Sequence, residues 1–253
     1  MKDYKPILSF GEEAAATYRD VQRGDELATV DFLAGLAGDG PALELAIGAG
    51  RIALPLTDRG IRVDGVEFAP AMIAELRNAE SRKAASRKNG GAEALKVTLG
   101  DFADVPVTGN YRLIYVVWNT LFNLTTQDDQ VRCFENVAAH LDDGGSFVVE
   151  AFLPDFLYRL RDHQYVDAES IGMDEVRLDV GRHDPAKQEL DESHVSLSAD
   201  GVRLNPIVSR YAWPSELDLM ARIAGLRLKE RWSSWERAAF DGTGRNVLSV
   251  WVR

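Results

Sequence analysis

Short apolar runs alternate with longer amphipathic stretches between residues 25 and 151. The apolar runs predict five strands, over residues 42–47, 61–67, 95–99, 111–117 and 146–151. The amphipathic stretches predict helices, over residues 25–37, 51–59, 71–88 and 127–141. The fourth run is apolar on both faces, which is typical of a buried parallel strand. The alternation therefore predicts a parallel sheet with right-handed crossover connections.

The pattern changes after residue 151, where short runs of alternating polar and apolar residues replace the helices. These runs predict antiparallel strands, at residues 176–180, 193–197 and 207–211. Asp184–Pro185 and Asp200–Gly201 predict the turns between them. Residues 152–213 are therefore expected to form an inserted antiparallel sheet, which we expect to cover the substrate as a lid.

The remaining segments complete a single α/β fold of the Rossmann-like, doubly wound type, with a mostly parallel sheet. Its core is expected over residues 41–151 and is completed by residues 214–253, which predict a helix and a pair of strands. Residues 1–40 are expected to form an N-terminal helical arm or cap, with one helix near residues 12–21.

Composition narrows the range of partners. The chain of 253 residues has a formal net charge of −11, and an acidic surface repels nucleic acid and anionic membranes. One cysteine, Cys133, excludes an internal disulfide, and the four histidines show no metal-ligand spacing. We therefore expect a cytoplasmic protein with no metal, no nucleic-acid partner and no membrane partner. A homodimer is left open.

A Gly-x-Gly turn stands between the first strand and the next helix, at Gly48 and Gly50. Glycine allows a ligand to approach the backbone closely, and the following helix offers N–H groups to an anion. The segment from Gly48 to Ala53 also fits the G-x-G-x-x-A form of a dinucleotide fold. A turn that needs glycine for its geometry alone is the alternative.

Polar residues or glycine stand at all five strand ends, and these ends meet at one edge of a parallel sheet. The residues are Gly48, Glu67, Asp101, Asn119 and Glu150. Glu67 follows the second strand, where a carboxylate can accept both hydroxyls of a ribose. The pattern therefore predicts a nucleotide-type site at this edge.

Five motifs resemble those of the class I S-adenosylmethionine-dependent methyltransferases. They lie at Glu44–Gly50, Val63–Met72, Gly100–Phe102, Trp118–Leu121 and Leu141–Phe147. The resemblance covers residues 40–151 well and extends more loosely through the last helix and strand pair. One departure is Ala46, which stands where the family's first glycine is usual. Alanine is the smallest replacement, so cofactor binding is expected to survive.

The resemblance implies S-adenosylmethionine as the cofactor and assigns a role to each matched position. Glu44 would support the glycine loop and meet the methionine amino group through water, or it is a structural acid. Asp101 would accept the adenine amino group, and Phe102 would flank the adenine ring. Six further residues are assigned to the cofactor site, with a structural alternative for several: Tyr18, Arg51, Phe68, Met72, Trp118 and Asn119.

The implied reaction is in-line methyl transfer to a nitrogen or oxygen atom of a small molecule. It needs no catalytic triad, because the cofactor carries the reactive group. Asn119, Glu150 and His163 are the catalytic candidates, whereas His140 and Cys133 are expected to be structural.

Two alternative functions are left open: an NAD(P)-dependent oxidoreductase and a non-catalytic S-adenosylmethionine-binding regulator. A nucleic-acid base methyltransferase is disfavoured, because Trp118–Leu121 lacks an Asn-Pro-Pro-Tyr motif.

Overall fold

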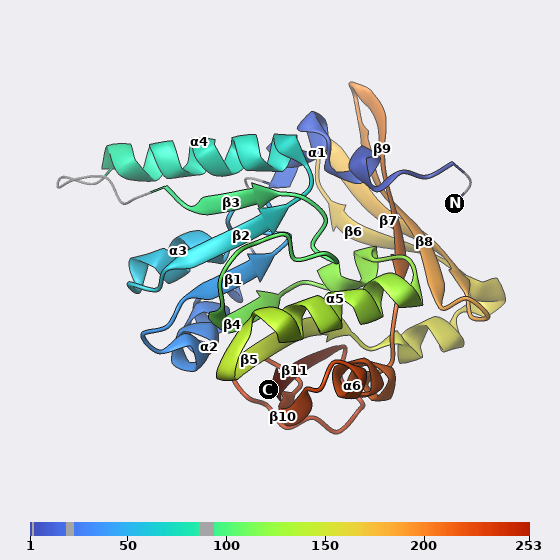
Figure 1. Ribbon diagram of the computed structural model, residues 1–253. Helices are drawn as coiled ribbons and strands as arrows, with labels where there is room; N and C mark the ends of the chain where they lie inside the picture. Colours follow the sequence, from blue (N-terminus) through green and yellow to red (C-terminus); the bar gives the residue numbers. More distant parts are fainter. Residues whose placement is uncertain (2, 19–22, 87–93) are drawn as a thin grey trace.

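A computed structural model describes residues 1, 3–18, 23–86 and 94–253 of the chain. Its main sheet has seven strands in the order β10-β11-β5-β4-β1-β2-β3 (Figure 1). The first five in chain order are parallel: β1 Ala42–Leu45, β2 Val63–Glu67, β3 Lys96–Leu99, β4 Tyr111–Val116 and β5 Leu141–Phe152. β11 (Asn246–Val252) runs antiparallel to both β5 and β10 (Arg227–Trp232). The predicted doubly wound, mostly parallel sheet is therefore confirmed.

Helices bury their apolar sides against both faces of this sheet. One core cluster contains side chains of α2 (Glu26–Ala37), α3 (Ala53–Asp58) and α4 (Pro70–Ser86). The other contains side chains of α5 (Gln127–His140) and α6 (Pro214–Ile223), including Phe134, which packs edge-on against Phe147 and Trp251. Apolar side chains on both faces explain why β4 has almost no polar residue.

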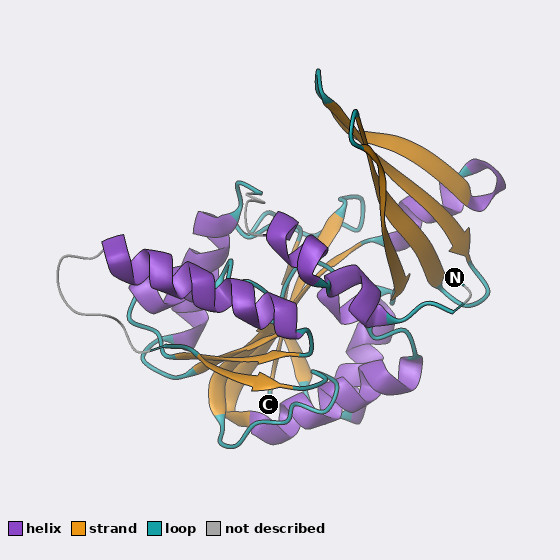
Figure 2. Ribbon diagram, turned by 90° about the horizontal axis from the view of Figure 1, so that it is seen from above, coloured by secondary structure: helices purple, strands orange, loops and turns teal. Residues whose placement is uncertain are grey.

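The insertion forms a second, four-stranded antiparallel sheet in the order β6-β7-β8-β9. Its strands are β6 Gln164–Ile171, β7 Glu175–Asp184, β8 Glu189–Ser198 and β9 Gly201–Arg210, and the short 3-10 helices η3 (Pro154–Arg159) and η4 (Arg161–His163) lead into it. This sheet projects from the body of the molecule (Figure 2). The three predicted strands and both turns are confirmed.

β6 was not predicted, because residues 152–173 show no alternation of polar and apolar positions. In the structure all of its residues except Tyr165 are exposed. An exposed strand has no buried face to select apolar residues at every second position, so it leaves no periodic signal.

The structure also moves several predicted boundaries. β5 begins at Leu141, which pairs with Tyr111, and not at residue 146 as predicted. The register shifts between Tyr111 and Leu113, and Gly144 has a φ of 69°. α3 begins at Ala53, two residues after its predicted start. Two predicted helix ends lie outside the described residues: that of the helix near residues 12–21 and that of the helix over residues 71–88.

The N-terminal arm comprises η1 (Pro6–Phe10) and α1 (Glu12–Tyr18). The Phe10 ring packs edge-on against Phe68, with 5.6 Å between the ring centroids, just after the end of β2. The Ser9 hydroxyl donates a hydrogen bond to the Pro206 carbonyl of β9. The arm therefore touches both the main sheet's carboxyl edge and the four-stranded sheet (Figure 1).

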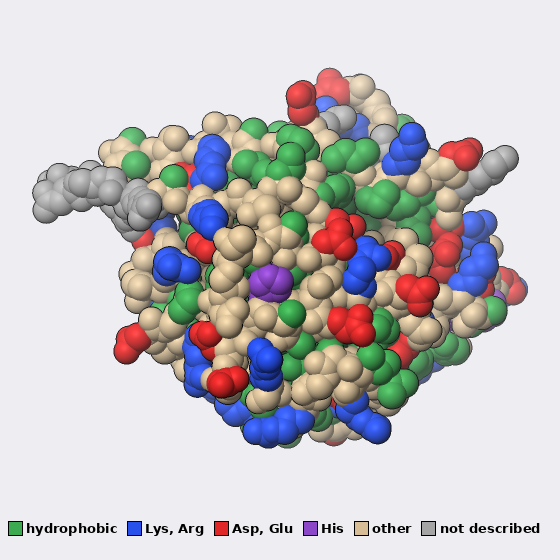
Figure 3. All heavy atoms as spheres, in the orientation of Figure 1, with side chains coloured by type: hydrophobic (Ala, Val, Ile, Leu, Met, Phe, Trp, Pro, Cys, Tyr) green, Lys and Arg blue, Asp and Glu red, His purple; other side chains and the backbone are tan. Residues whose placement is uncertain are grey.

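Acidic and basic side chains are interspersed over the face that Figure 3 shows. No helix in the described part of the chain is long and apolar enough to span a membrane.

A buried polar network fixes the end of the four-stranded sheet to α5 and α6. The Arg210 guanidinium of β9 donates to Gln130 Oε1 at 2.8 Å and to Glu216 Oε1 at 2.7 Å. The Gln130 amide donates in return to the Arg210 carbonyl at 2.7 Å and to the Leu124 carbonyl at 3.0 Å. Arg210 is only 8% exposed, so these bonds replace solvation that the charge loses on folding.

We expect Arg210→Met to lower the free energy of unfolding by about 3 kcal/mol, because it leaves the buried partners of a charge unpaired. Urea denaturation measures this loss. The matched control is Arg132→Met, since Arg132 is 44% exposed and pairs with Asp104 and Asp129 on the surface. That change should cost less than about 1 kcal/mol. Equal losses in the two variants would show that the network does not anchor the sheet.

Candidate functional site

The loop after β1 forms a tight turn that only small residues allow. Ala46, Gly48 and Gly50 all have positive φ values, of 54°, 57° and 82°. A Cβ on Gly50 would lie 2.4 Å from Leu76 Cδ1 of α4, so a larger residue would have to displace that side chain besides adopting an unfavourable positive φ. Ala46 occupies a left-handed conformation that glycine adopts more readily, which is a physical reason for glycine at this position elsewhere in the family.

Glu67 connects the glycine loop to the start of α4. Its Oε2 atom accepts a hydrogen bond from Gly48 N at 2.9 Å, and Oε1 accepts one from Ala69 N at 2.9 Å. Burial raises the pKa of Glu67, while the amides of Ala69, Gly48 and Phe68 lower it. Each carboxylate oxygen keeps a second lone pair, so the side chain has capacity to accept ribose hydroxyls. Its role towards a ribose stays a prediction.

Glu44 lies within β1 and is 3% exposed. The Tyr115 hydroxyl of the neighbouring strand β4 donates to its Oε2 atom at 2.9 Å. Burial raises the pKa of Glu44 to about 8, although Tyr115, Arg51 and the Ala53 amide lower it. The contacts support the structural alternative, in which Glu44 stabilises the segment below the glycine loop.

The residues that follow β2 and β3 divide between the surface and the core. Asp101 is exposed, and its Oδ1 atom accepts a hydrogen bond from Ala103 N at 2.8 Å. Phe102 is 6% exposed and Met72 is 2% exposed, and both belong to core clusters. These two side chains therefore have little surface for a ligand, whereas Phe68 is partly exposed beside the arm. Contact of Asp101, Phe102, Phe68 and Met72 with the cofactor stays a prediction.

The turn after β4 has an unusual backbone that Glu150 stabilises. Trp118 and Asn119 both adopt left-handed φ values, of 57° and 59°, which costs energy for residues other than glycine. Glu150 Oε2 accepts a hydrogen bond from Trp118 N at 2.8 Å, and the Glu150 carbonyl accepts one from Asn119 N at 3.1 Å. The Trp235 indole donates to Glu150 Oε1 at 3.0 Å.

Glu150 therefore has a structural role, because it holds the backbone of this turn by hydrogen bonds. Its side chain is 8% exposed, and both carboxylate oxygens already accept an N–H group. Burial raises its pKa, the Trp118 amide lowers it and Asp25 raises it further. The sequence placed Glu150 at the right edge of the sheet but showed neither the Trp118 contact nor Trp235, which lies in a loop without periodic pattern.

Arg51 lies between the glycine loop and the start of α2. Its Nη1 atom is 2.9 Å from Asp25 Oδ1 and 3.2 Å from Glu26 Oε1. The Arg51 guanidinium carbon is also 5.4 Å from the centroid of the Trp118 ring. Asp25 was not predicted, because an acid at a helix start is usual and gives no functional signal.

Tyr18 lies close to these groups from the arm. Burial raises its pKa, Arg23 lowers it, Glu67 raises it and Arg51 lowers it. The side chain is 38% exposed, and its ring centroid lies 6.3 Å from that of Phe10 in the same arm. Closure of the cofactor pocket by Tyr18 stays a prediction.

His163 is grouped with residues of the insertion. Its ring centroid is 5.6 Å from that of His183, whose Nε2 atom is 2.8 Å from the Tyr211 hydroxyl. His140 and Cys133, which are expected to be structural, are held within the fold. His140 has both ring nitrogens against backbone carbonyls, of Asn136 and Val107, and Cys133 is fully buried with a raised pKa.

Comparisons with known proteins identify the family. A family profile described as "Methyltransferase domain" matches residues 42–145. The CcbJ methyltransferase from Streptomyces caelestis superposes with a TM-score of 0.88 and 36% sequence identity, over 98% of this chain and 98% of that chain. The chain belongs to the class I S-adenosylmethionine-dependent methyltransferases. The NAD(P)-dependent oxidoreductase and the non-catalytic regulator are thereby set aside, and the cofactor is S-adenosylmethionine.

Two more distant methyltransferases share the fold. CalS10, an amino pentose methyltransferase from Micromonospora echinaspora, has a TM-score of 0.67 at 20% identity, over 95% of this chain and 96% of that chain. KedS8, a sugar N-methyltransferase from Streptoalloteichus sp., has a TM-score of 0.67 at 19% identity, over 96% and 93%. Among curated protein sequences, none matches this methyltransferase.

We expect Glu67→Ala to weaken S-adenosylmethionine binding at least tenfold, because each charge-assisted hydrogen bond contributes about 1.5–3 kcal/mol. Isothermal titration calorimetry with S-adenosylmethionine measures the change. Glu135→Ala is the matched control, because Glu135 is exposed on α5. Unchanged affinity in a folded Glu67→Ala protein would show that Glu67 serves only the glycine loop.

The raised pKa of Glu44 predicts a pH-dependent stability. Between its ordinary pKa of 4.5 and about 8, the unfolded chain loses the Glu44 proton while the folded chain keeps it. This residue's contribution to stability therefore falls as the pH rises, by at most about 1.4 kcal/mol per pH unit. Glu44→Gln lacks this contribution, so its stability relative to the unmodified protein should rise from pH 5 to pH 8. Urea denaturation at pH 5 and pH 8 measures the difference in unfolding free energy between the two proteins. The same difference at both pH values would contradict the expectation.

Proposed function

We propose that this methyltransferase transfers the methyl group to an amine nitrogen of a hydroxylated small molecule. The observation that carries the proposal is a pocket at the sheet edge that three carboxylates line, those of Asp25, Glu150 and Glu236. Asp25 is paired with Arg51, and Glu236 is exposed. Carboxylates attract a charged ammonium group more strongly than a neutral hydroxyl group. The sugar N-methyltransferase KedS8 and the amino pentose methyltransferase CalS10 share the fold and support the same chemistry.

The residues around the glycine loop fit S-adenosylmethionine. Apart from its chain neighbours, no atom of the described residues lies within 4 Å of the position that a Cβ would take on Gly48, so the loop backbone is open to close approach there. Glu67 would hold the ribose hydroxyls, and Arg51 would meet the carboxylate of the methionine part. When bound, the cofactor supplies an electrophilic methyl group on a sulfonium centre.

The turn after β4 would orient the acceptor. Asn119 lies in the turn that Glu150 holds, and its amide can donate to or accept from an acceptor atom. An amine reacts through its neutral form, so it must lose a proton before transfer but needs no base during it. His163 lies with His183 in the insertion, which favours a part in acceptor contact over a part in proton transfer.

The insertion of residues 152–213 would cover the acceptor. β9 lies against the 3-10 helix η2 (Thr120–Asn123), which directly follows Asn119, and against η1 of the arm. The four-stranded sheet is thus held next to the turn that orients the acceptor. The cofactor contacts proposed above come from residues that precede residue 120.

The proposal is tested by offering the purified enzyme S-adenosylmethionine with matched pairs of acceptors. D-Glucosamine and D-glucose differ only in an amine and a hydroxyl at one position. We expect methylated product from amine-bearing acceptors only, detected by mass spectrometry with equimolar S-adenosylhomocysteine. His163→Ala should change the acceptor KM and leave cofactor affinity within twofold.

Methylation of hydroxyl groups on both members of a pair would overturn the proposed nitrogen specificity. Loss of cofactor affinity in His163→Ala, with the acceptor KM unchanged, would show that the insertion belongs to the cofactor site and is not the lid.

A further inference from the structure

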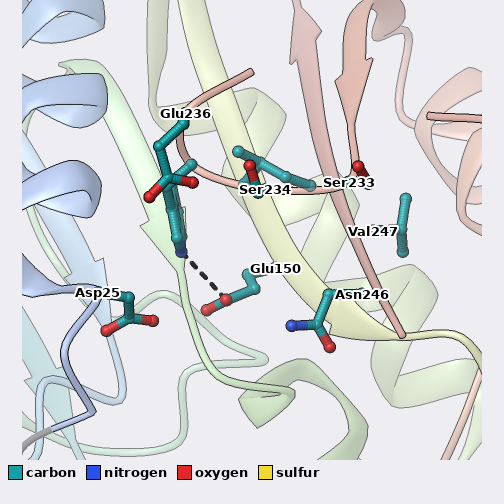
Figure 4. Close-up of a pocket in the computed structure, with 9 residues that line it drawn as sticks. Asp25, Glu150, Ser233, Ser234, Glu236, Asn246 and Val247 are labelled. Atoms are coloured by element: carbon teal, nitrogen blue, oxygen red, sulfur yellow. Dashed lines mark hydrogen bonds between the residues drawn. The ribbon is translucent and has the colours of Figure 1, made fainter. Parts of the chain in front are cut away.

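A pocket of about 150 Å³ opens at the carboxyl edge of the main sheet, next to Glu150 (Figure 4). Its walls come from three segments: the start of α2, the end of β5, and the loop after β10 together with the first residues of β11. The volume corresponds to about five water molecules at roughly 30 Å³ each. It is therefore large enough for part of a small organic ligand.

The pocket adjoins the cofactor cradle but lies farther along the sheet edge. The glycine loop and Glu67 lie at the ends of β1 and β2, whereas the pocket lies at the end of β5 and the start of β11. Asp25 of its wall contacts Arg51 of the cradle. Adjacent strands are about 4.8 Å apart, so β5 and β11 lie roughly 10 and 14 Å from β1. Between cradle and pocket lies the turn of Trp118 and Asn119, whose backbone Glu150 binds. The pocket is thus on the side of this turn away from the glycine loop.

The charged groups in the lining are acidic. Three carboxylates line the pocket, those of Asp25, Glu150 and Glu236, and the described lining residues include no lysine or arginine. Two arginines lie behind this lining: Arg51 pairs with Asp25, and Arg23 is close enough to Glu150 and Asp25 for their charges to interact. Glu150 also binds the N–H groups of Trp118 and Trp235. Glu236 is exposed at the rim, so its negative charge can meet an incoming cation.

The uncharged part of the lining suits a ligand with hydroxyl groups and an apolar side. Ser233, Ser234 and Asn246 supply hydroxyl and amide groups, which donate and accept hydrogen bonds. The Asn246 side chain points into the space opposite Asp25 (Figure 4). Trp235, Val247 and Leu248 supply apolar surface. A few convergent polar groups on an apolar wall are usual in small-molecule sites.

We propose that this pocket is a binding subsite for a protonated amine that carries hydroxyl groups, with Glu236 and Asp25 facing the ammonium and Ser233, Ser234 and Asn246 binding the hydroxyls. The assignment of this ligand as the methyl acceptor rests on the proposed function, whereas the binding chemistry itself does not. The subsite holds the acceptor beyond Asn119, so that one end of the acceptor can reach the reaction centre.

The experiment measures binding without methyl transfer. The full-length enzyme, saturated with S-adenosylhomocysteine, is titrated with D-glucosamine and with D-glucose, and saturation-transfer NMR gives each affinity. We expect glucosamine to bind at least threefold more tightly than glucose. Glu236→Gln should reduce that preference at least threefold, and Asn246→Leu should weaken both sugars by filling the space.

Two controls keep the result specific. Glu135→Gln makes the same charge change at an exposed position on α5 and should leave both affinities unchanged. S-Adenosylhomocysteine affinity should stay within twofold in all variants, and thermal melting confirms that Asn246→Leu is folded.

Three outcomes would overturn the subsite. One is equal binding of the two sugars to the unmodified enzyme, and a second is sugar binding that neither pocket variant changes. The third is a loss of cofactor affinity in the pocket variants, which would assign the pocket to the methionine part of the cofactor. Failure of nitrogen methylation with an intact glucosamine preference would instead overturn the proposed function alone.

Discussion

Glu150 of β5 joins two other parts of the chain, the turn after β4 and the loop after β10. Its carboxylate binds the Trp118 amide and the Trp235 indole, and its backbone carbonyl accepts a hydrogen bond from Asn119 N. A left-handed backbone at two successive side-chain-bearing residues persists only when surrounding contacts compensate its cost. The geometry of Trp118 and Asn119 therefore depends on a residue that the sequence alone suggests as a proton acceptor.

The same logic applies to Glu44 and Glu67, which lie with Glu150 along one edge of the sheet. Each is buried, and each accepts hydrogen bonds that hold a neighbouring segment. Burial raises the pKa of all three. The edge is thus built from acids whose first task is to fix backbone, which leaves ligands to contact a preformed surface.

The main sheet could be predicted from local periodicity, and its parallel strands place the polar residues of the strand ends at one edge. The role of that edge as the site stays a prediction. β6 could not be predicted, since its exposed residues carry no alternation. The partners of Glu150, Arg51 and Glu44 could not either. Asp25, Trp235 and Tyr115 are distant in sequence or ordinary in type, and only the packing of strands and loops brings them into contact. Phe102 and Met72 show the opposite case, because their motif position suggested a pocket wall and they lie in the core.

The bond between the Trp235 indole and Glu150 has an optical consequence. Tryptophan emission responds to a charge beside the indole ring, and this charge is the one that holds the turn of Trp118 and Asn119. Trp235 is 6% exposed and borders the pocket, so solvent contributes little to its emission. Trp235 is one of five tryptophans in the chain, and its share of the intrinsic fluorescence depends on the carboxylate that also binds this turn.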